Sequence, residues 1–177
     1  KFPDCSIFVD KETSAFPELG TQTTYEATHA SIVKRARQLA TLGVRQGDKV
    51  LLYKSSSVDT YWLAVSVCYL GAIPVMTSFH LSSEVIEIFS ERLEKPWILF
   101  DDVTAERITS LPEEVKQRAF SVSDVLQADE ADVDFNPLPD TEISYMTHTS
   151  GTTGVPKLIA HSAISIGFPY FTRSFPL

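Results

Sequence analysis

The chain has 177 residues, of which 44% are hydrophobic and 21% charged, a balance that is typical of a folded globular protein. This length allows one domain, or one domain and part of another. The formal net charge of -8 argues against a general affinity for nucleic acid or anionic membranes, so a bound polyanion requires a local arrangement of donors.

The first helix is predicted after Thr24, which follows a short β-like run at residues 6–9. Thr24 is a good N-cap, because its hydroxyl can accept a hydrogen bond from a free N–H of the first turn. Apolar residues then recur at helical spacing over residues 32–40, and Gly43 provides a C-terminal stop. The polar side of this amphipathic pattern carries Lys34, Arg35 and Gln38.

Strands alternate with helices in the next segment. Residues 50–53 form an uninterrupted apolar run, as expected of a strand that is buried on both faces of a parallel sheet. Helical patterns follow at residues 58–70 and after Ser82, and a second strand pattern occupies residues 97–100. The alternation indicates an α/β fold of layered β-α-β units with a mostly parallel sheet. In such sheets, ligands gather beyond the carboxyl ends of the strands.

The segment before residue 143 is less regular. We predict a strand at residues 120–122 and a helical turn at residues 123–126. Residues 128–140 are acidic and contain Pro137 and Pro139, a composition that favours a surface connector with solvated charges.

Cysteine usage and hydropathy bear on the compartment. Cys5 and Cys68 belong to no C-x-x-C pair, which is typical of inert thiols in a reducing cytosol, so we expect a cytoplasmic protein. The longest apolar stretch, residues 61–76, is interrupted by Gly71 and Pro74. Because a membrane-spanning helix needs about 20 apolar residues, we assign this stretch to the core and predict no membrane span.

The most unusual stretch follows an apolar run at residues 143–146. It is rich in Ser, Thr and Gly, and it ends at Lys157 before a second strand candidate at residues 158–160. Glycines let the main chain approach an anion closely, successive N–H groups form a nest of donors, and the lysine adds positive charge. The pattern predicts a phosphate-binding loop between two strands. A flexible linker, the other interpretation, has no reason to lie between apolar runs and to end on Pro-Lys.

This loop is not a P-loop of the Walker type, which requires G-x-x-x-x-G-K-[ST]. Counting from Gly151, Pro156 stands where the second glycine should be, and Leu158 follows the lysine in place of Ser or Thr.

Residues 149–157 instead resemble the signature T-S-G-T-T-G-x-P-K of the adenylate-forming superfamily, and they match it at every fixed position. The superfamily contains acyl- and aryl-CoA ligases, adenylation domains of nonribosomal peptide synthetases, and luciferases. Residues 42–50 resemble its L-G-V-x-x-G-D-x-V element, and residues 71–76 resemble its G-A-x-x-V-P-L element. The resemblance is strongest over residues 24–161. It implies that residues 1–177 are the N-terminal portion of the large, AMP-binding domain of such an enzyme.

The resemblance implies ATP-dependent activation of a carboxylic acid to an acyl-adenylate, with release of pyrophosphate. The acyl group then passes to a thiol of CoA or of a phosphopantetheine arm, so a carrier protein is a candidate partner. Such chemistry is mainly positional and electrostatic, and it needs ATP and Mg²⁺.

The resemblance also implies the roles of individual residues. Lys157 would be the catalytic residue that neutralises charge on the departing pyrophosphate, and the hydroxyl of Thr152 or Thr153 would be a ligand of Mg²⁺. Which of the two threonines binds the metal stays open. The residues expected to contact the nucleotide are Thr149, Ser150, Gly151, Thr152, Thr153, Gly154, Lys157 and His161.

Several positions depart from the pattern or leave alternatives. Most relatives have glycine after the lysine, whereas this chain has Leu158. His161 resembles a histidine of acyl-CoA ligases that read P-K-x-x-x-H, and it either lies near the nucleotide or is structural. The same two alternatives, a place near the nucleotide or a structural role, hold for His148. His29 and His80 are expected at the surface or in packing.

Later motifs of the superfamily, including its adenine-binding segment and C-terminal catalytic lysine, do not occur in the 177 residues. We therefore expect the C-terminal lid domain to be absent, the remainder of the polypeptide to be a partner of this part, and the isolated part to be inactive. One alternative is a noncatalytic nucleotide-binding or interaction module. Another is an α/β domain that only binds a phosphate-bearing metabolite. The intact Lys157 and the hydroxyl-rich loop argue against loss of the chemistry.

Overall fold

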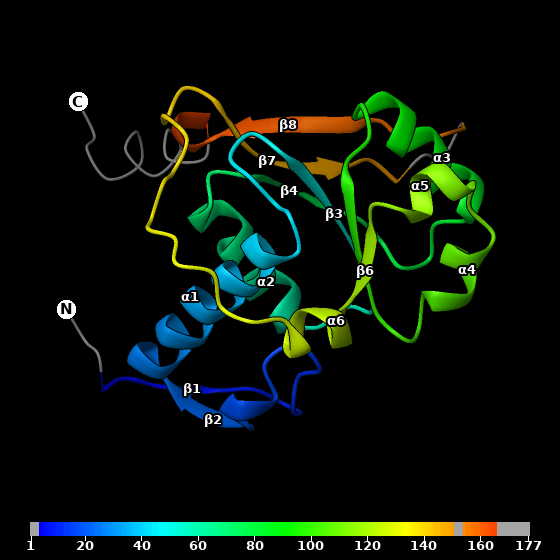
Figure 1. The fold of residues 1–177 in the computed structure, drawn as a ribbon. Helices are drawn as coiled ribbons and strands as arrows, with labels where there is room; N and C mark the ends of the chain where they lie inside the picture. The colour runs from blue at the N-terminus through cyan, green and yellow to red at the C-terminus, as the bar shows by residue number, and fades with distance from the viewer. Residues whose placement is uncertain (1–3, 151–153, 166–177) are drawn as a thin grey trace.

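The computed structural model describes residues 4–150 and 154–165. A six-stranded sheet forms its centre, in the spatial order β6-β5-β3-β4-β7-β8 (Figure 1). Five of these strands are parallel, and β8 pairs antiparallel with β7 at the edge. The predicted α/β fold with a mostly parallel sheet is therefore confirmed. The strands are β3 (Lys49–Tyr53), β4 (Ile73–Met76), β5 (Trp97–Phe100), β6 (Ala119–Ser121), β7 (Ile143–His148) and β8 (Leu158–Ser162).

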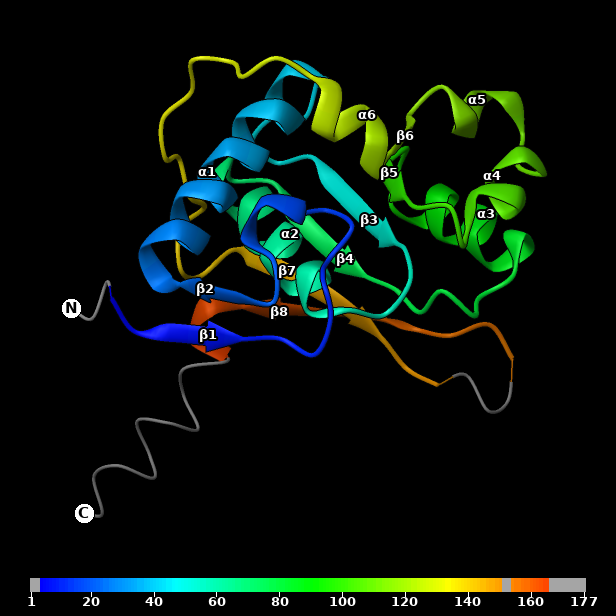
Figure 2. The ribbon, with the colours of Figure 1, turned by 90° about the horizontal axis from the view of Figure 1, so that it is seen from below.

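Helices cover both faces of the sheet (Figures 1 and 2). One face packs against α1 (Tyr25–Thr41), α2 (Val58–Tyr69) and α6 (Val122–Gln127), and the other lies toward α3 (Ser83–Arg92), α4 (Ala105–Thr109) and α5 (Glu113–Lys116). Because side chains alternate along a strand, β3 contributes to both cores. Val50 and Leu52 lie in the first core, and Leu51 and Tyr53 in the second. This explains why its sequence is apolar throughout.

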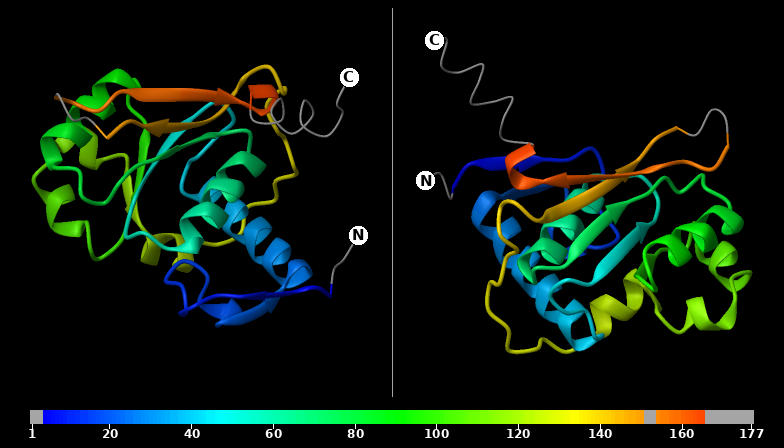
Figure 3. Two further views of the ribbon diagram at one scale, coloured as in Figure 1. Left: turned by 180° about the vertical axis from the view of Figure 1, so that it is seen from behind. Right: turned by 90° about the horizontal axis from the view of Figure 1, so that it is seen from above.

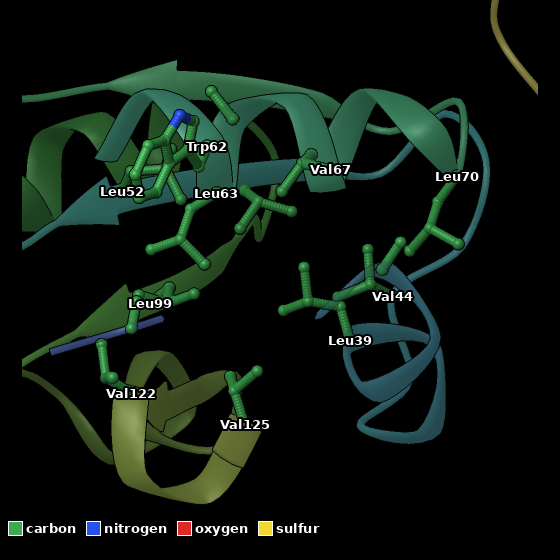
Figure 4. Close-up of a cluster of buried hydrophobic side chains, with 14 of the residues drawn as sticks. Leu39, Val44, Leu52, Trp62, Leu63, Val67, Leu70, Leu99, Val122 and Val125 are labelled. Atoms are coloured by element: carbon green, nitrogen blue, oxygen red, sulfur yellow. The ribbon is translucent and has the colours of Figure 1, made fainter. Parts of the chain in front are cut away.

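The first core joins residues that are far apart in the sequence (Figure 4). Leu52 and Leu99 point from the sheet toward Leu63 of α2, and Val122 and Val125 approach from α6. Full burial of one such side chain contributes about 1.5–3 kcal/mol, so this core accounts for much of the folding energy.

A small antiparallel hairpin lies beside the start of α1 (Figure 3). It consists of β1 (Ser6–Phe8) and β2 (Gln22–Thr24), with the 3-10 helix η1 (Pro17–Leu19) between them. The strand expected at residues 6–9 is present, but its partner β2 was not predicted. None of the helices within residues 4–150 and 154–165 is long and apolar enough to cross a bilayer.

The ends of α1 agree with the sequence. The Thr24 hydroxyl accepts a hydrogen bond from the Ala27 N–H at 3.2 Å, and Gly43 adopts φ +104° just after the helix. On the polar side, Lys34 is exposed as predicted, but the prediction was wrong for Arg35 and Gln38, which are each only 2% exposed.

A hydrogen-bond network explains the burial of these two polar side chains. Arg35 donates to the Ala15 carbonyl at 2.7 Å, to Glu18 at 2.7 Å and to Gln38 at 2.8 Å. Gln38 in turn donates to the Ala128 carbonyl at 3.0 Å. Burial lowers the pKa of the Arg35 guanidinium, and Glu18 opposes this shift. Buried polar groups destabilise a fold when they lack hydrogen-bond partners. The network supplies these partners and so allows Arg35 and Gln38 to be buried.

The segment from residue 101 to residue 140 shows what the pattern missed. The short helices α4 and α5 were not predicted, and β6 begins one residue before the predicted strand. Ser121 forms a capping box with Asp124 at the start of α6. Residues 128–140 contain neither helix nor strand, which agrees with the predicted connector.

A buried ion pair lies where β3 meets α2. Lys54 and Asp59 are 2.8 Å apart, and neither side chain is exposed. Asp59 also accepts a hydrogen bond from the Ala15 N–H at 3.1 Å. One carboxylate thus fixes the end of β3, the start of α2 and the segment before η1.

Replacement of Asp59 by Asn should lower the free energy of unfolding by about 3–5 kcal/mol, because it leaves the Lys54 ammonium buried without its counter-charge. Urea unfolding at pH 7 measures this. The matched control is Glu113→Gln, which breaks an exposed pair with Lys116 and should cost less than about 1 kcal/mol. Equal losses in the two variants would contradict the assignment.

The two cysteines differ in environment. Cys5 is exposed, whereas burial raises the pKa of the Cys68 thiol to about 11. Because only the thiolate is nucleophilic, iodoacetamide at pH 8 should modify Cys5 much faster than Cys68. In denaturant, the two cysteines should be modified at similar rates. Mass spectrometry of timed samples checks this. Similar rates in the folded protein would show that Cys68 is accessible.

Candidate phosphate-binding site

The Ser/Thr/Gly segment joins β7 to β8, as the sequence predicted (Figure 3). The two strands pair as far as His148 and Leu158, and two further hydrogen bonds close the base of the loop. The Thr149 N–H donates to the Lys157 carbonyl at 3.0 Å, and the Lys157 N–H donates to the Thr149 hydroxyl at 3.0 Å. The Thr149 hydroxyl therefore has a structural role, and its own proton stays available for a ligand.

Five of the predicted nucleotide contacts are described by the structure, and three are not. Ser150, Gly154 and Lys157 are exposed, and Gly154 has φ +147°, a backbone conformation that favours glycine. The other three predicted residues, Gly151, Thr152 and Thr153, lie outside the described residues. The two candidate metal ligands are among these three.

The second strand of the hairpin is held by packing. Pro156 is buried, and its carbonyl accepts a hydrogen bond from Arg92 of α3 at 3.4 Å. Leu158, which departs from the glycine of most relatives, packs against the second core. An apolar side chain at this position thus anchors the start of β8, directly after Lys157.

His161 lies in β8, at the pair opposite Tyr145. Its ring stacks on Tyr145 with centroids 4.5 Å apart, and its Nε2 is 3.0 Å from the Thr147 hydroxyl. It lies four positions after Lys157, which corresponds to roughly 13 Å of extended chain. The side chain has a clear structural role in the hairpin, and a contact with nucleotide stays a prediction.

The loop lies at the carboxyl edge of the sheet. Strand β7 is parallel to β4, so His148 and Met76 end at the same edge. At this edge β3 leads to α2 on one face, and β4 leads to α3 on the other. Such a switch point is where open α/β sheets bind ligands.

A cavity of about 460 Å³ opens at the same switch point. It is walled by residues that follow β3 and β4 together with the start of α2, and it is rich in hydroxyl groups. The lining residues are Lys54, Ser56, Ser57, Thr60, Tyr61, Met76, Thr77, Ser78, Phe79 and His80.

His148 connects this edge to the loop, a contact that the sequence did not reveal. Its Nε2 is 3.0 Å from the Ser78 backbone N–H, and its Nδ1 is 2.7 Å from the Thr149 carbonyl. Ser78 is 70 residues away in the sequence, so only the fold brings the two together.

Known proteins provide an independent comparison. A 2-succinylbenzoate–CoA ligase from Geobacillus sp. (strain WCH70) is 33% identical over 135 residues, which cover 76% of this chain and 26% of the ligase. A 3-amino-2-hydroxy-4-methoxybenzoate diazotase from Streptomyces cremeus is 28% identical over 187 residues, which cover 88% of this chain and 34% of the diazotase. The chain thus spans about a quarter to a third of the length of these relatives.

Solved structures show the same fold. A long-chain-fatty-acid-CoA ligase from Archaeoglobus fulgidus superposes with a TM-score of 0.79 at 19% identity, over 97% of this chain and 37% of that one. An O-succinylbenzoate coenzyme A synthetase from Bacillus subtilis, in complex with AMP, superposes with a TM-score of 0.74 at 18% identity. The match covers 98% of this chain and 42% of the synthetase. The sequence model described as "AMP-binding enzyme" matches residues 1–172. The chain therefore belongs to the AMP-binding enzyme family.

Proposed function

We propose that the protein containing this chain activates a carboxylic acid with ATP. A carboxylate oxygen attacks the α-phosphorus, the bond from that phosphorus to the bridging oxygen breaks, and pyrophosphate leaves. A thiol then displaces AMP from the acyl-adenylate and forms a thioester. The observation that carries this proposal is the closed hairpin loop with an exposed Lys157, which lies at the ligand-binding edge of the sheet.

The described contacts support a division of labour within the loop. Thr149 holds the base of the loop closed through its backbone and hydroxyl, which keeps Lys157 beside Thr149 at the end of the paired strands. The Lys157 ammonium is the positive charge that compensates the β- and γ-phosphates as negative charge builds up on the leaving group. Hydroxyl and N–H groups of residues 150–154 would donate to the same phosphates.

A magnesium ion fits the chemistry of this segment, because hydroxyl oxygens are hard ligands and ATP phosphates complete its shell. The hydroxyl of Thr152 or Thr153 would bind it, and the ion would add charge compensation at the phosphates.

The acceptor is proposed as CoA or a phosphopantetheine thiol. Ligases that are named for CoA transfer occur among the relatives in sequence and structure. A structural neighbour with a TM-score of 0.73 is an adenylation domain joined to a carrier domain and complexed with phenylalanyl-adenylate. The first group favours CoA. Because the chain spans only part of its relatives, we propose that turnover needs the remaining domains.

Acid-dependent exchange between ATP and pyrophosphate in the full-length protein tests the proposed function. A panel of aryl, aliphatic and amino acids should yield exchange with one class, and Lys157→Ala should reduce it at least a hundredfold, because a charge that acts on the leaving group is lost. Lys34→Ala removes an exposed lysine on α1 and should leave the rate unchanged. MgATP binding without exchange for any acid would favour a noncatalytic nucleotide-binding module.

Replacement of Thr149 by Val keeps the shape of the side chain and removes the acceptor of the Lys157 N–H. A hydrogen bond of this kind contributes about 0.5–1.5 kcal/mol, so kcat/KM for MgATP in the exchange assay should fall roughly three- to tenfold. Thr141→Val, at an exposed position just before β7, is the control. An unchanged kcat/KM in Thr149→Val would show that the base of the loop does not depend on this bond.

A further inference from the structure

We propose that His148 is a positioning residue, which fixes the base of the phosphate-binding loop to the carboxyl end of β4. This inference rests on the proposed function for its kinetic consequence, but its geometry can be tested without turnover. Neither the loop motif nor the family match assigns a role to this side chain.

The two contacts of the ring define its tautomer. A backbone N–H can only donate, so the Nε2 atom that lies 3.0 Å from the Ser78 N–H must carry a lone pair. A neutral imidazole then carries its proton on Nδ1, which donates to the Thr149 carbonyl at 2.7 Å. Both ring nitrogens are therefore used, one as acceptor and one as donor.

These bonds complete a connection that the sheet does not provide. The register of β4 and β7 pairs Val75 with Met146, and the ladder stops short of Ser78 and Thr149. The imidazole spans this gap. Thr149, in turn, donates its N–H to the Lys157 carbonyl, so one ring links the end of β4 to both sides of the loop base.

The ring is also held from the side of α3. Phe89 is fully buried in the second core, and its ring centroid lies 6.3 Å from that of His148 at an angle of 51°. Packing of this kind restricts the rotamer and directs the two nitrogens along the sheet edge. A purely apolar role is the competing explanation, and it predicts that phenylalanine would serve as well.

The test uses the full-length protein with His148→Phe, which retains an aromatic ring and removes both hydrogen bonds. We expect KM for MgATP in the exchange assay to rise at least tenfold, with KM for the acid unchanged within twofold. His148→Asn retains a donor near the Nδ1 position and His148→Gln an acceptor near the Nε2 position, so each should give an intermediate value even if the phenylalanine variant folds poorly. His29→Phe, at an exposed site on α1, should behave like the wild type.

Imidazole ¹⁵N spectra supply a readout that a packing role would not produce. At pH 8 the wild type should show His148 as the Nδ1–H tautomer. A predominant Nε2–H tautomer, or a His148→Phe variant with wild-type KM for MgATP, would overturn the proposal.

Failure of the proposed function is recognised separately, as absence of exchange in the wild type. In that case the dissociation constant of MgATP, measured by calorimetry, replaces KM. An unchanged constant in His148→Phe, or no binding of MgATP by the wild type, would then overturn the role of His148.

Discussion

The two hydrogen bonds between Thr149 and Lys157 are the constraint on which the candidate site depends. They bring the two ends of the Ser/Thr/Gly segment together at the end of the paired strands β7 and β8. Bringing the ends of a loop together lowers the conformational entropy of the chain. The pairing of β7 and β8 compensates for this loss before any ligand binds. The closed base keeps Lys157 beside Thr149 before a ligand binds, and groups that are already in place stabilise charge without reorganisation.

The rest of the fold serves to hold this hairpin at one place. The buried strands β3, β4 and β5 supply a rigid layer between two apolar cores, and β7 joins it beside β4. Buried polar contacts then fix the edges. The Lys54–Asp59 pair sets the exit of β3, and His148 spans from the exit of β4 to the loop. Apolar packing thus gives stability, while these few directional bonds determine where the edge elements lie.

The sequence predicted those parts of the fold that local patterns determine. Residues 50–53 and 97–100 are apolar throughout because both faces of the sheet are covered, and Thr24 caps α1 through a neighbour three residues away. The loop was recognisable because its donors are consecutive. The predictions from sequence failed for side chains whose hydrogen-bond partners are distant in the sequence. Arg35 looked like a surface residue because its contacts with Ala15 and Glu18 depend on the fold, and the bond from Ser78 to His148 crosses 70 residues.

The proposed function requires that the hairpin loop binds the phosphates of ATP. A crystal structure of the full-length protein with Mg²⁺ and α,β-methylene-ATP tests it most directly. We expect phosphate oxygens within about 3 Å of the loop N–H groups and of the Lys157 ammonium. Phosphates bound in the cavity that follows β3 and β4, with Lys157 Nζ well beyond hydrogen-bond distance, would contradict it.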